Sequence, residues 1–554
     1  MKENRFDYYT AISILPLLIL ILVFFLPLYQ NLRMAFIFEG SFTIERVEEC
    51  FQSAYNRQIL LFTLKQAALS SLFSILFALP GAYLFSNYRF TLRKLILSIS
   101  NLCFFLPSIL VVLGFVIFYG NSGVLNTLLM KVMKTSEPPL KILYSFKAII
   151  LAHIFLNFPI ALSLITDTWS HLSKNQENAS LSMGASGLET FIRVTLPRIL
   201  PVILSAALLI FLFCFTSFSI ILVLGGGPQF TTIEVEIYRL NNIVLDQEKA
   251  AALSVYSFTM NLICLTIYLL FSSLFKNKEK NRLSRLRRPT SRITYLAITL
   301  YILLMLIFFF SPLVSIVWRS FYSTSQRYGT GYTTRAYREL FGLESSIALA
   351  NTLDAIMNSI QIAILSACVS TIISICLALW ISKRRKGGIF ELLSMLPMAI
   401  SSVTLGLGYS ILRANISEDS ILSGPVLVIL AHTVIILPFC LRTLLPVLRS
   451  QNENKLNAAY TMGSGVMKAS FDIEIPTIKS SIIRAFIFAF ALSMGEVNAT
   501  LTLARGKVST LPLQIYRLIN SYNYQSACAV GTILITITFI VFLLCEYLFR
   551  EGER

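Results

Sequence analysis

Two stretches of this sequence are near-copies of each other, and they decide how the rest of the chain is organised. "LNAAYTMGSGVMKASFDIEIP" covers residues 456–476, and "ENASLSMGASGLETFIRVTLP" covers residues 177–197. Both stretches are polar, contain glycines and end in a proline, whereas most of the surrounding chain is apolar. Because one polar stretch occurs twice in an apolar chain, we expect both copies to face water and to serve the same purpose.

The surrounding composition is typical of a membrane protein. Hydrophobic residues make up 56% and charged residues 13% of the 554 positions, whereas a soluble chain is about half apolar and a quarter charged. Apolar runs of about twenty residues, each long enough to cross a bilayer as a helix, recur along the chain. The runs are continuous rather than alternating, which argues against a β-barrel. We therefore predict an all-α polytopic membrane protein with twelve transmembrane helices, near residues 11–29, 60–86, 99–119, 146–166, 201–224, 250–275, 295–317, 358–381, 389–412, 424–446, 482–503 and 526–549.

The net charge of +18 would suit a nucleic-acid-binding protein if it lay on a soluble face. Instead it lies in short stretches between the apolar runs, so nucleic acid is excluded as a partner. The loops 87–94, 276–292 and 382–388 are basic and fall on one side, whereas 38–50 is net acidic and falls on the other. Basic loops favour the cytoplasm, which predicts that both termini are cytoplasmic. The nine cysteines show no metal-ligand spacing, so no metal site is expected.

The two halves of the chain are repeats. "LAH" at 151–153 returns at 430–432, and three further pairs are separated by the same 279 positions: Pro159 and Pro438, Gly184 and Gly463, Pro197 and Pro476. Such regularity indicates two copies of one structural unit. With six spans each, both copies face the same way and form a parallel repeat. We predict a first module over 1–275, a basic linker over 276–292 and a second module over 293–554.

Each polar segment, 175–198 and 454–477, leaves the fourth span of its module and enters the fifth. Gly184 and Gly463 follow short helix-forming stretches, where glycine can end a helix in a left-handed conformation. Proline follows thirteen residues later, where it suits the first turn of a new helix. We expect a short helix, a glycine break, a second piece and then the next span. Two such surfaces on one side suit a partner with twofold symmetry.

This pattern resembles the coupling loop of binding-protein-dependent ABC importer permeases: Glu-Ala-Ala, three residues, Gly, and later a hydrophobic residue and Pro. Asn stands in both copies where the family most often has Glu, although Glu177 directly precedes the first copy. The resemblance implies a type I ABC importer permease fold. It also implies an ATPase-coupling role for Glu177, Asn178, Ala179, Gly184, Pro197, Asn457, Ala458, Ala459, Gly463 and Pro476.

Further partners follow from the same resemblance. The sequence contains no G-x-x-x-x-G-K-[ST] loop to hold nucleotide phosphates, so the chain is expected not to be an enzyme. It would bind no cofactor itself, and ATP and Mg would belong to a homodimeric ABC ATPase at the cytoplasmic face. An extracytoplasmic binding protein would deliver the solute. The expected location is a bacterial cytoplasmic (inner) membrane, where the chain contacts lipid and crosses many times.

The fused two-module form resembles the iron(III)/thiamine branch of this superfamily. "FTSFSIILVLGGGPQFTTIEVEIYRL" at 215–240, with its Gly-Gly-Gly-Pro turn followed by Thr-Thr-Ile-Glu, looks most like the thiamine permeases. That similarity implies import of thiamine or a thiamine phosphate, with ferric iron as the alternative cargo. From another class, a secondary, ion-coupled transporter with two six-span halves stays open, although the spans contain few deep charges.

Glu496 is a candidate for the solute path, because a charged residue inside a span usually faces a cavity or a partner. A carboxylate there would attract a cation. The alternative is that Glu496 pairs with a neighbouring helix or lies near the outer interface. Asn498 and Ser217 are weaker candidates for the same path. His153 and His432 lie in the two "LAH" motifs, where hydrogen bonding between helices is more plausible than metal ligation.

Overall fold

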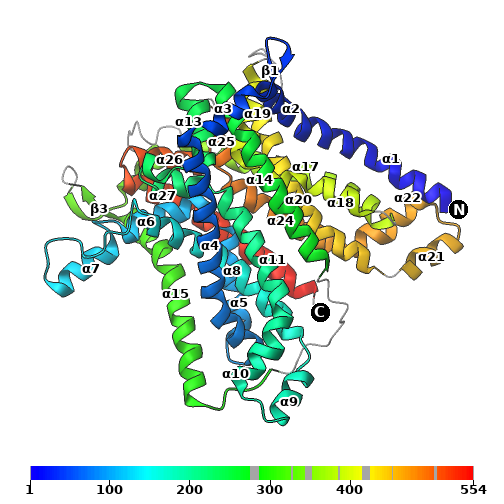
Figure 1. The fold of residues 1–554 in the computed structure, drawn as a ribbon, viewed down its shortest axis with the longest axis horizontal. Helices are drawn as coiled ribbons and strands as arrows, with labels where there is room; N and C mark the ends of the chain where they lie inside the picture. Colours follow the sequence, from blue (N-terminus) through cyan, green and yellow to red (C-terminus); the bar gives the residue numbers. More distant parts are fainter. Residues whose placement is uncertain are drawn as a thin grey trace. The chain divides into compact units, whose positions relative to one another are not determined.

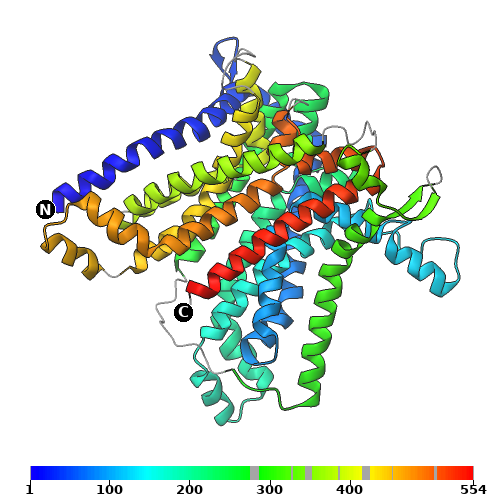
Figure 2. The same cartoon turned by 180° about the vertical axis from the view of Figure 1, so that it is seen from behind.

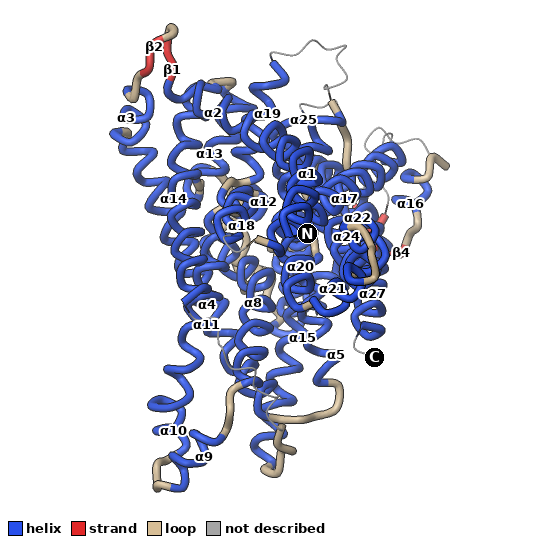
Figure 3. The backbone as a smooth tube through the Cα atoms, turned by 90° about the vertical axis from the view of Figure 1, so that its right-hand side faces the viewer, coloured by secondary structure: helices blue, strands red, loops and turns tan. Residues whose placement is uncertain are grey.

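The computed structural model describes residues 2–274, 286–325, 329–343, 352–384, 387–414, 424–451, 453–504 and 508–552. Figure 3 shows that this part of the chain is built almost entirely from helices. Its strands form two short hairpins, which consist of β1 (Ile37–Phe38) with β2 (Ser41–Phe42) and β3 (Tyr322–Ser325) with β4 (Gly329–Tyr332). The predicted linker 276–292 lies outside the described residues up to position 285.

The predicted helical spans are confirmed. Ten helices of the described chain are long and apolar enough to cross a membrane, and two bent helix pairs bring the number to as many as twelve. Each of them overlaps one of the twelve predicted runs. The all-α membrane fold is therefore the observed one.

Both third spans are broken rather than continuous, which the apolar runs did not reveal. In the first half, α5 (Arg93–Phe105) and α6 (Ser108–Tyr119) are separated at Pro107. In the second half, α18 (Gly387–Met395) and a 3₁₀ turn (Leu396–Ala399) precede α19 (Ser402–Ala414), with a bend of 97°. A proline supplies no N–H for the helix and disfavours helical geometry in the residue before it, so "LP" in each run accounts for the break.

The helices gather into two compact units, and each unit contains residues from both sequence halves. Unit 1 comprises residues 1–53, 236–258 and 332–554, and unit 2 comprises residues 54–235 and 259–331. The first span of each half therefore belongs to the unit built mainly from the other half. The modules 1–275 and 293–554 describe the sequence repeat and stay a prediction, since the compact units are divided differently.

In unit 2, three long helices lie side by side: α4 (Ala54–Asn87), α8 (Phe146–His171) and α11 (Leu196–Phe215) (Figure 1). The helix α15 (Arg292–Phe321) packs against α6. Tyr301 of α15 donates a hydrogen bond to the carbonyl group of Phe77 at 3.1 Å. A Cβ atom at Gly114 would lie 2.9 Å from Cβ of Pro312, so only glycine lets α15 approach α6 this closely.

In unit 1, α17 (Thr352–Lys383) packs against α20 (Pro425–Ser450) and α24 (Lys479–Gly495), and α24 packs against α27 (Tyr524–Gly552) (Figure 2). The N-terminal region consists of α1 (Lys2–Leu20), a π turn (Ile21–Phe25) and α2 (Leu26–Phe36). Tyr409 of α19 donates to the carbonyl group of Val23 at 2.6 Å. Gly408 of α19 faces the backbone of Pro27, and a Cβ atom there would overlap it. Both units thus use glycine on a third span to admit a proline-containing first span.

Shorter elements connect these helices. They are α3 (Glu45–Gln52), α7 (Val124–Met133), α12 (Ser219–Leu224), a 3₁₀ turn (Pro228–Phe230), α13 (Ile233–Arg239), a π turn (Leu240–Val244), α16 (Arg335–Leu340), α25 (Asn498–Ala504) and α26 (Leu511–Asn520). The long helix α14 (Gln247–Leu274) is a further candidate span.

Candidate functional site

The two polar segments have the same local structure. In the first, α9 (Asn175–Ser182) is followed by Gly184 with φ of +88°, and in the second, α21 (Glu453–Thr461) is followed by Gly463 with φ of +85°. Matched backbone hydrogen bonds close the two helix ends, from Ala185 N to Ser180 O (3.2 Å) and from Ser464 N to Ala459 O (3.0 Å). This is the Schellman arrangement, which needs a left-handed residue. The predicted glycine breaks are confirmed.

Beyond the glycine, each segment continues into a π-helical turn. The first has α10 (Gly187–Thr190) and η2 (Phe191–Thr195), and the second has α22 (Val466–Ala469), η6 (Ser470–Glu474) and α23 (Ile475–Thr477). The next helix then begins with proline in its first turn, as predicted. Since a proline ring would collide with the carbonyl group four residues earlier, the wider π turn accommodates it.

The two copies differ in how they enter the next span. Residues Gly187–Phe215 form one continuous helical span, so in the first copy the second piece runs directly into the fifth span. In the second copy, the helices on either side of Ile478 are bent by 67°. The fifth span of the first copy therefore begins at Gly187, earlier than the predicted start near residue 201.

Each segment exposes three large apolar side chains at matched repeat positions. The pairs, all 279 positions apart, are Met183 (82% exposed) and Met462 (81%), Leu188 (70%) and Met467 (60%), and Ile192 (52%) and Phe471 (56%). Exposed apolar groups gathered on a polar segment mark an interaction surface. Sequence analysis missed these residues, although comparing the two copies position by position would have found them.

The interior of each segment is held by different chemistry. In the first, Thr195 donates to Oε1 of Glu177 at 2.8 Å. The Ser180 and Thr190 hydroxyls lie 3.0 Å apart and share a hydrogen bond. In the second, these four positions are occupied, in the same order of numbering, by Leu456, Ala459, Ala469 and Glu474. Leu456, Ala459 and Ala469 belong to a small apolar cluster that also contains Tyr460. Apolar packing thus replaces hydrogen bonding there.

The remaining predicted coupling residues lie on the surface, with one exception. Asn178, Ala179, Asn457 and Ala458 are exposed, whereas Ala459 is buried. Arg287 donates to Oδ1 of Asn178 at 3.2 Å, which brings the described end of the linker to the first segment. Contact of these residues with an ATPase stays a prediction.

The first segment is also joined to the end of α4. Nζ of Lys174 donates to Oδ1 of Asn87 at 3.2 Å. Burial of the ammonium group, and then repulsion by Arg287, lower the pKa of Lys174. This contact connects the segment with the second span of its half, in unit 2.

Glu496 lies in a break between α24 and α25. Its Oε1 accepts hydrogen bonds from the backbone N–H groups of Asn498 (2.8 Å) and Ala499 (3.1 Å), and its Oε2 accepts one from Ser402 at 3.4 Å. The carboxylate therefore caps the first turn of α25, where a negative charge is favourable. Ser402 belongs to α19, so Glu496 also contacts a neighbouring helix.

The other path candidates lie in similar surroundings. Asn498 is partly exposed at the start of α25, and Ser217, the repeat equivalent of Glu496, is partly exposed in the break between α11 and α12. Irregular backbone at membrane depth is tolerated only inside protein or beside a water-filled cavity. A solute-path role for the three residues stays a prediction.

The two repeat-related histidines are buried and hydrogen-bonded. His153 shares a hydrogen bond with Ser70 at 2.9 Å, and His432 shares hydrogen bonds with Ser493 (2.8 Å) and Thr500 (2.9 Å). These contacts join neighbouring helices. Among the residues that the structure describes, His, Cys, Asp and Glu form no group of three able to hold a metal ion.

Comparison with known proteins agrees with this architecture. Residues 70–280 match the family described as binding-protein-dependent transport system inner membrane component. The chain is 27% identical to the thiamine transport system permease protein ThiP of Haemophilus influenzae over 492 residues, which cover 89% of this chain and 88% of the relative. It is also 27% identical to the Escherichia coli protein of the same name over 514 residues, or 90% of each chain.

A more distant relative carries a different name. The ferric transport system permease protein FbpB of Actinobacillus pleuropneumoniae is 22% identical over 543 residues, which cover 96% of this chain and 77% of the relative. With the repeat, the spans and the two matched segments, these similarities agree with the predicted class. Along most of its length the chain is similar to multi-span permeases of binding-protein-dependent transport systems, which confirms the resemblance stated from the sequence.

Proposed function

We propose that the chain is the translocation subunit of an ATP-driven importer and that segments 175–198 and 454–477 dock the two subunits of a separate ATPase. The observation that supports this most directly is the matched set of exposed apolar residues on the two segments. An ATPase dimer with two identical clefts needs two similar surfaces. The glycine caps and π turns give both surfaces the same backbone.

The rest of the importer follows from this assignment. ATP and Mg are held by the partner ATPase, so the chain itself is not an enzyme. Both termini and both coupling segments lie in the cytoplasm, as the basic loops predict. A binding protein on the opposite side of the inner membrane delivers the solute, and lipid surrounds the helices.

The proposed solute is thiamine or a thiamine phosphate. Support comes from the similarity to the thiamine permeases, which extends over about nine-tenths of the chain. Ferric iron is the second candidate, because the chain also resembles a ferric permease over nearly its whole length. The larger identity with the thiamine permeases favours thiamine.

The test is reconstitution in liposomes with the ATPase and the binding protein. ATP-dependent uptake of radiolabelled thiamine and of ferric iron is measured in parallel, with a complex that lacks ATP as the control. Uptake of thiamine alone supports the proposal. Uptake of iron alone replaces thiamine by the second candidate, and uptake of neither solute contradicts both assignments of cargo.

A further inference from the structure

Glu474 is a buried charged residue at the end of the second segment. It is the last residue of η6, directly before Ile475 and Pro476, and its exposed fraction is 0%. Asp472, two residues earlier in the same turn, is exposed. Burying a carboxylate is unfavourable unless other groups pair with it, so its partners determine what this residue does.

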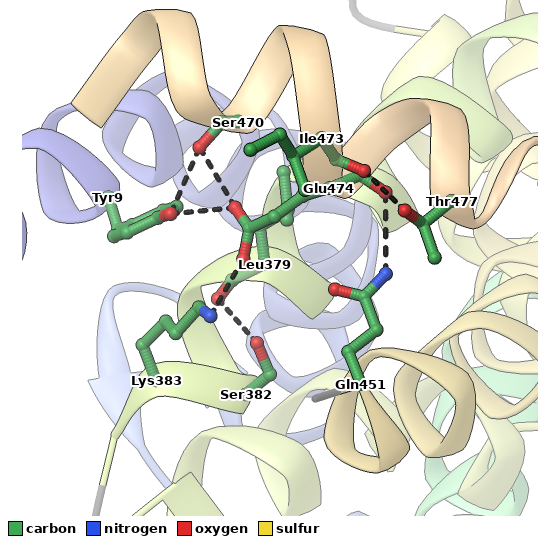
Figure 4. Close-up of polar contacts among 9 residues, drawn as sticks. All are labelled: Tyr9, Leu379, Ser382, Lys383, Gln451, Ser470, Ile473, Glu474 and Thr477. Atoms are coloured by element: carbon green, nitrogen blue, oxygen red, sulfur yellow. Dashed lines mark hydrogen bonds and ion pairs between the residues drawn. The ribbon is translucent and has the colours of Figure 1, made fainter. Parts of the chain in front are cut away.

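Side chains from three elements surround the carboxylate (Figure 4). Nζ of Lys383, in the last turn of α17, lies 2.7 Å from Oε1 of Glu474. Oε2 accepts hydrogen bonds from the hydroxyl groups of Tyr9 (2.7 Å) and Ser470 (2.9 Å). Gln451, directly after α20, donates to the backbone carbonyl group of Glu474 at 3.3 Å. One residue of the segment is thus bonded to α1, α17 and the end of α20.

The charges of this cluster are paired and largely shielded from water. The Lys383 side chain is 27% exposed, and Tyr9 is 4% exposed. Burial, and then the hydrogen bond to Glu474, raise the pKa of the Tyr9 phenol, so it stays protonated and donates. Replacing a buried ion pair by apolar residues is often neutral for stability, whereas removing only one partner is strongly destabilising, so the two partners of such a pair are held together. This chemistry suits a fixed mechanical connection.

The first segment lacks an equivalent. Thr195 occupies the repeat position of Glu474, and its hydroxyl group bonds to Glu177 within the same segment. Leu456 stands at the repeat position of Glu177. In the first copy, the acidic residue Glu177 therefore bonds within its own segment. In the second copy, the acidic residue Glu474 connects the segment to other helices.

We propose that Glu474 is a positioning residue through which the second coupling segment moves α17 and the N-terminal helix α1 together when the ATPase changes state. The inference rests on the proposed function, because it takes segment 454–477 as the ATPase contact. In unit 1, α1 packs against α17, and α17 packs against α20 and α24. A displacement of Glu474 therefore reaches the helices that form the centre of this unit.

The test separates coupling from folding. Glu474→Leu alone leaves Lys383 without its partner, so the main variant is Glu474→Leu with Lys383→Met, which removes both charges and keeps apolar bulk. The hydroxyl groups of Tyr9 and Ser470, 2.9 Å apart, still bond to each other. The matched control is Glu391→Leu with Arg449→Met, which removes the 2.7 Å ion pair between α18 and α20 outside the segment. ATP hydrolysis by each complex is measured with and without the binding protein, together with ATPase binding and thermal unfolding.

The double variant is expected to unfold at the wild-type temperature, bind the ATPase normally and keep basal hydrolysis. Stimulation of hydrolysis by the binding protein should fall by about 2- to 30-fold, the range that changes within a coupling network produce. The control that removes Glu391 and Arg449 should leave stimulation unchanged. Wild-type stimulation in the Glu474 and Lys383 double variant overturns the proposal, as does an equal loss in this control.

This readout uses no labelled solute, so it is independent of the cargo. A wild-type complex that responds to the binding protein but does not import thiamine contradicts the proposed solute and leaves the test of Glu474 valid. A chain that binds no ATPase contradicts the proposed function and Glu474's role together. Thiamine uptake per ATP hydrolysed, where the wild type imports it, should fall in parallel with stimulation.

Discussion

Replacing the glycine at the end of α21 should impair ATPase coupling through the backbone alone. Gly463 has φ of +85°, and a Cβ atom built on it meets nothing within 4 Å. Alanine therefore fits sterically, and its only cost is the left-handed conformation, about 1–2 kcal/mol. That cost reduces the population of the native helix end by about 5- to 30-fold relative to competing conformations.

The assay is ATP hydrolysis stimulated by the binding protein, in liposomes that contain the complete complex. Gly463→Ala should lower stimulation severalfold, because a cap that no longer forms misplaces Met462 beside it. Gly463→Asn should retain more activity, since asparagine tolerates the left-handed region better than other residues. Basal hydrolysis and the amount of protein in the membrane should stay unchanged.

Gly465 supplies the matched control two residues away. Its φ is −65°, and a Cβ atom there also meets nothing within 4 Å. Gly465→Ala should therefore leave stimulation at the wild-type level. Equal losses of stimulated ATP hydrolysis in both alanine variants, or full stimulation in Gly463→Ala, would refute the argument that coupling needs the left-handed cap.

Three other predictions use different parts of the chain. Met462→Asp should weaken ATPase binding by about fivefold or more, because loss of an apolar contact residue can cost over about 1 kcal/mol. Thermal unfolding should stay unchanged, and pull-down with the purified ATPase measures the loss of binding. Gly408→Ala should destabilise unit 1 by about 1–3 kcal/mol, because its Cβ atom would overlap the Pro27 backbone; thermal unfolding in detergent, with Gly465→Ala as reference, tests this. Glu496→Gln should raise KM for thiamine uptake without changing basal hydrolysis if the carboxylate attracts the cation, and an unchanged KM would leave Glu496 with only its capping role.

The sequence predicted the features that depend on local composition. Apolar runs were long enough to identify every span, and the spacing of Gly184 and Pro197, repeated at Gly463 and Pro476, predicted the glycine caps and the proline-initiated helices. These features follow from short-range physics, namely burial of apolar side chains and the allowed backbone angles of single residues.

Features that depend on distant packing were not predicted. Nothing in the apolar pattern indicates that α2 packs against α19, or that α15 packs against α6. Their contacts depend on Gly408 and Gly114, which an apolar run does not distinguish from other small residues. Glu474 was likewise counted as part of a water-facing loop, and only the packed structure shows that it is buried. Aligning the two copies shows that the charged Glu474 stands where the first copy has the neutral Thr195. The alignment does not show the groups that pair with the buried carboxylate.

Under the proposed function, segments 175–198 and 454–477 share some features and differ in others for separate reasons. Their outward features are the same in both copies: a left-handed glycine, a π turn before a proline and three exposed apolar side chains at matched positions. Their inward contacts differ, with Thr195 bonded inside its own segment and Glu474 bonded to Lys383 and Tyr9. A symmetric ATPase pair requires equal outward surfaces, whereas a single fused chain can give each surface its own connection to the helices. Equal displacements of the two segments by the ATPase would therefore move the attached helices unequally. Mutations in the second segment should reduce ATPase coupling more than the equivalent mutations in the first.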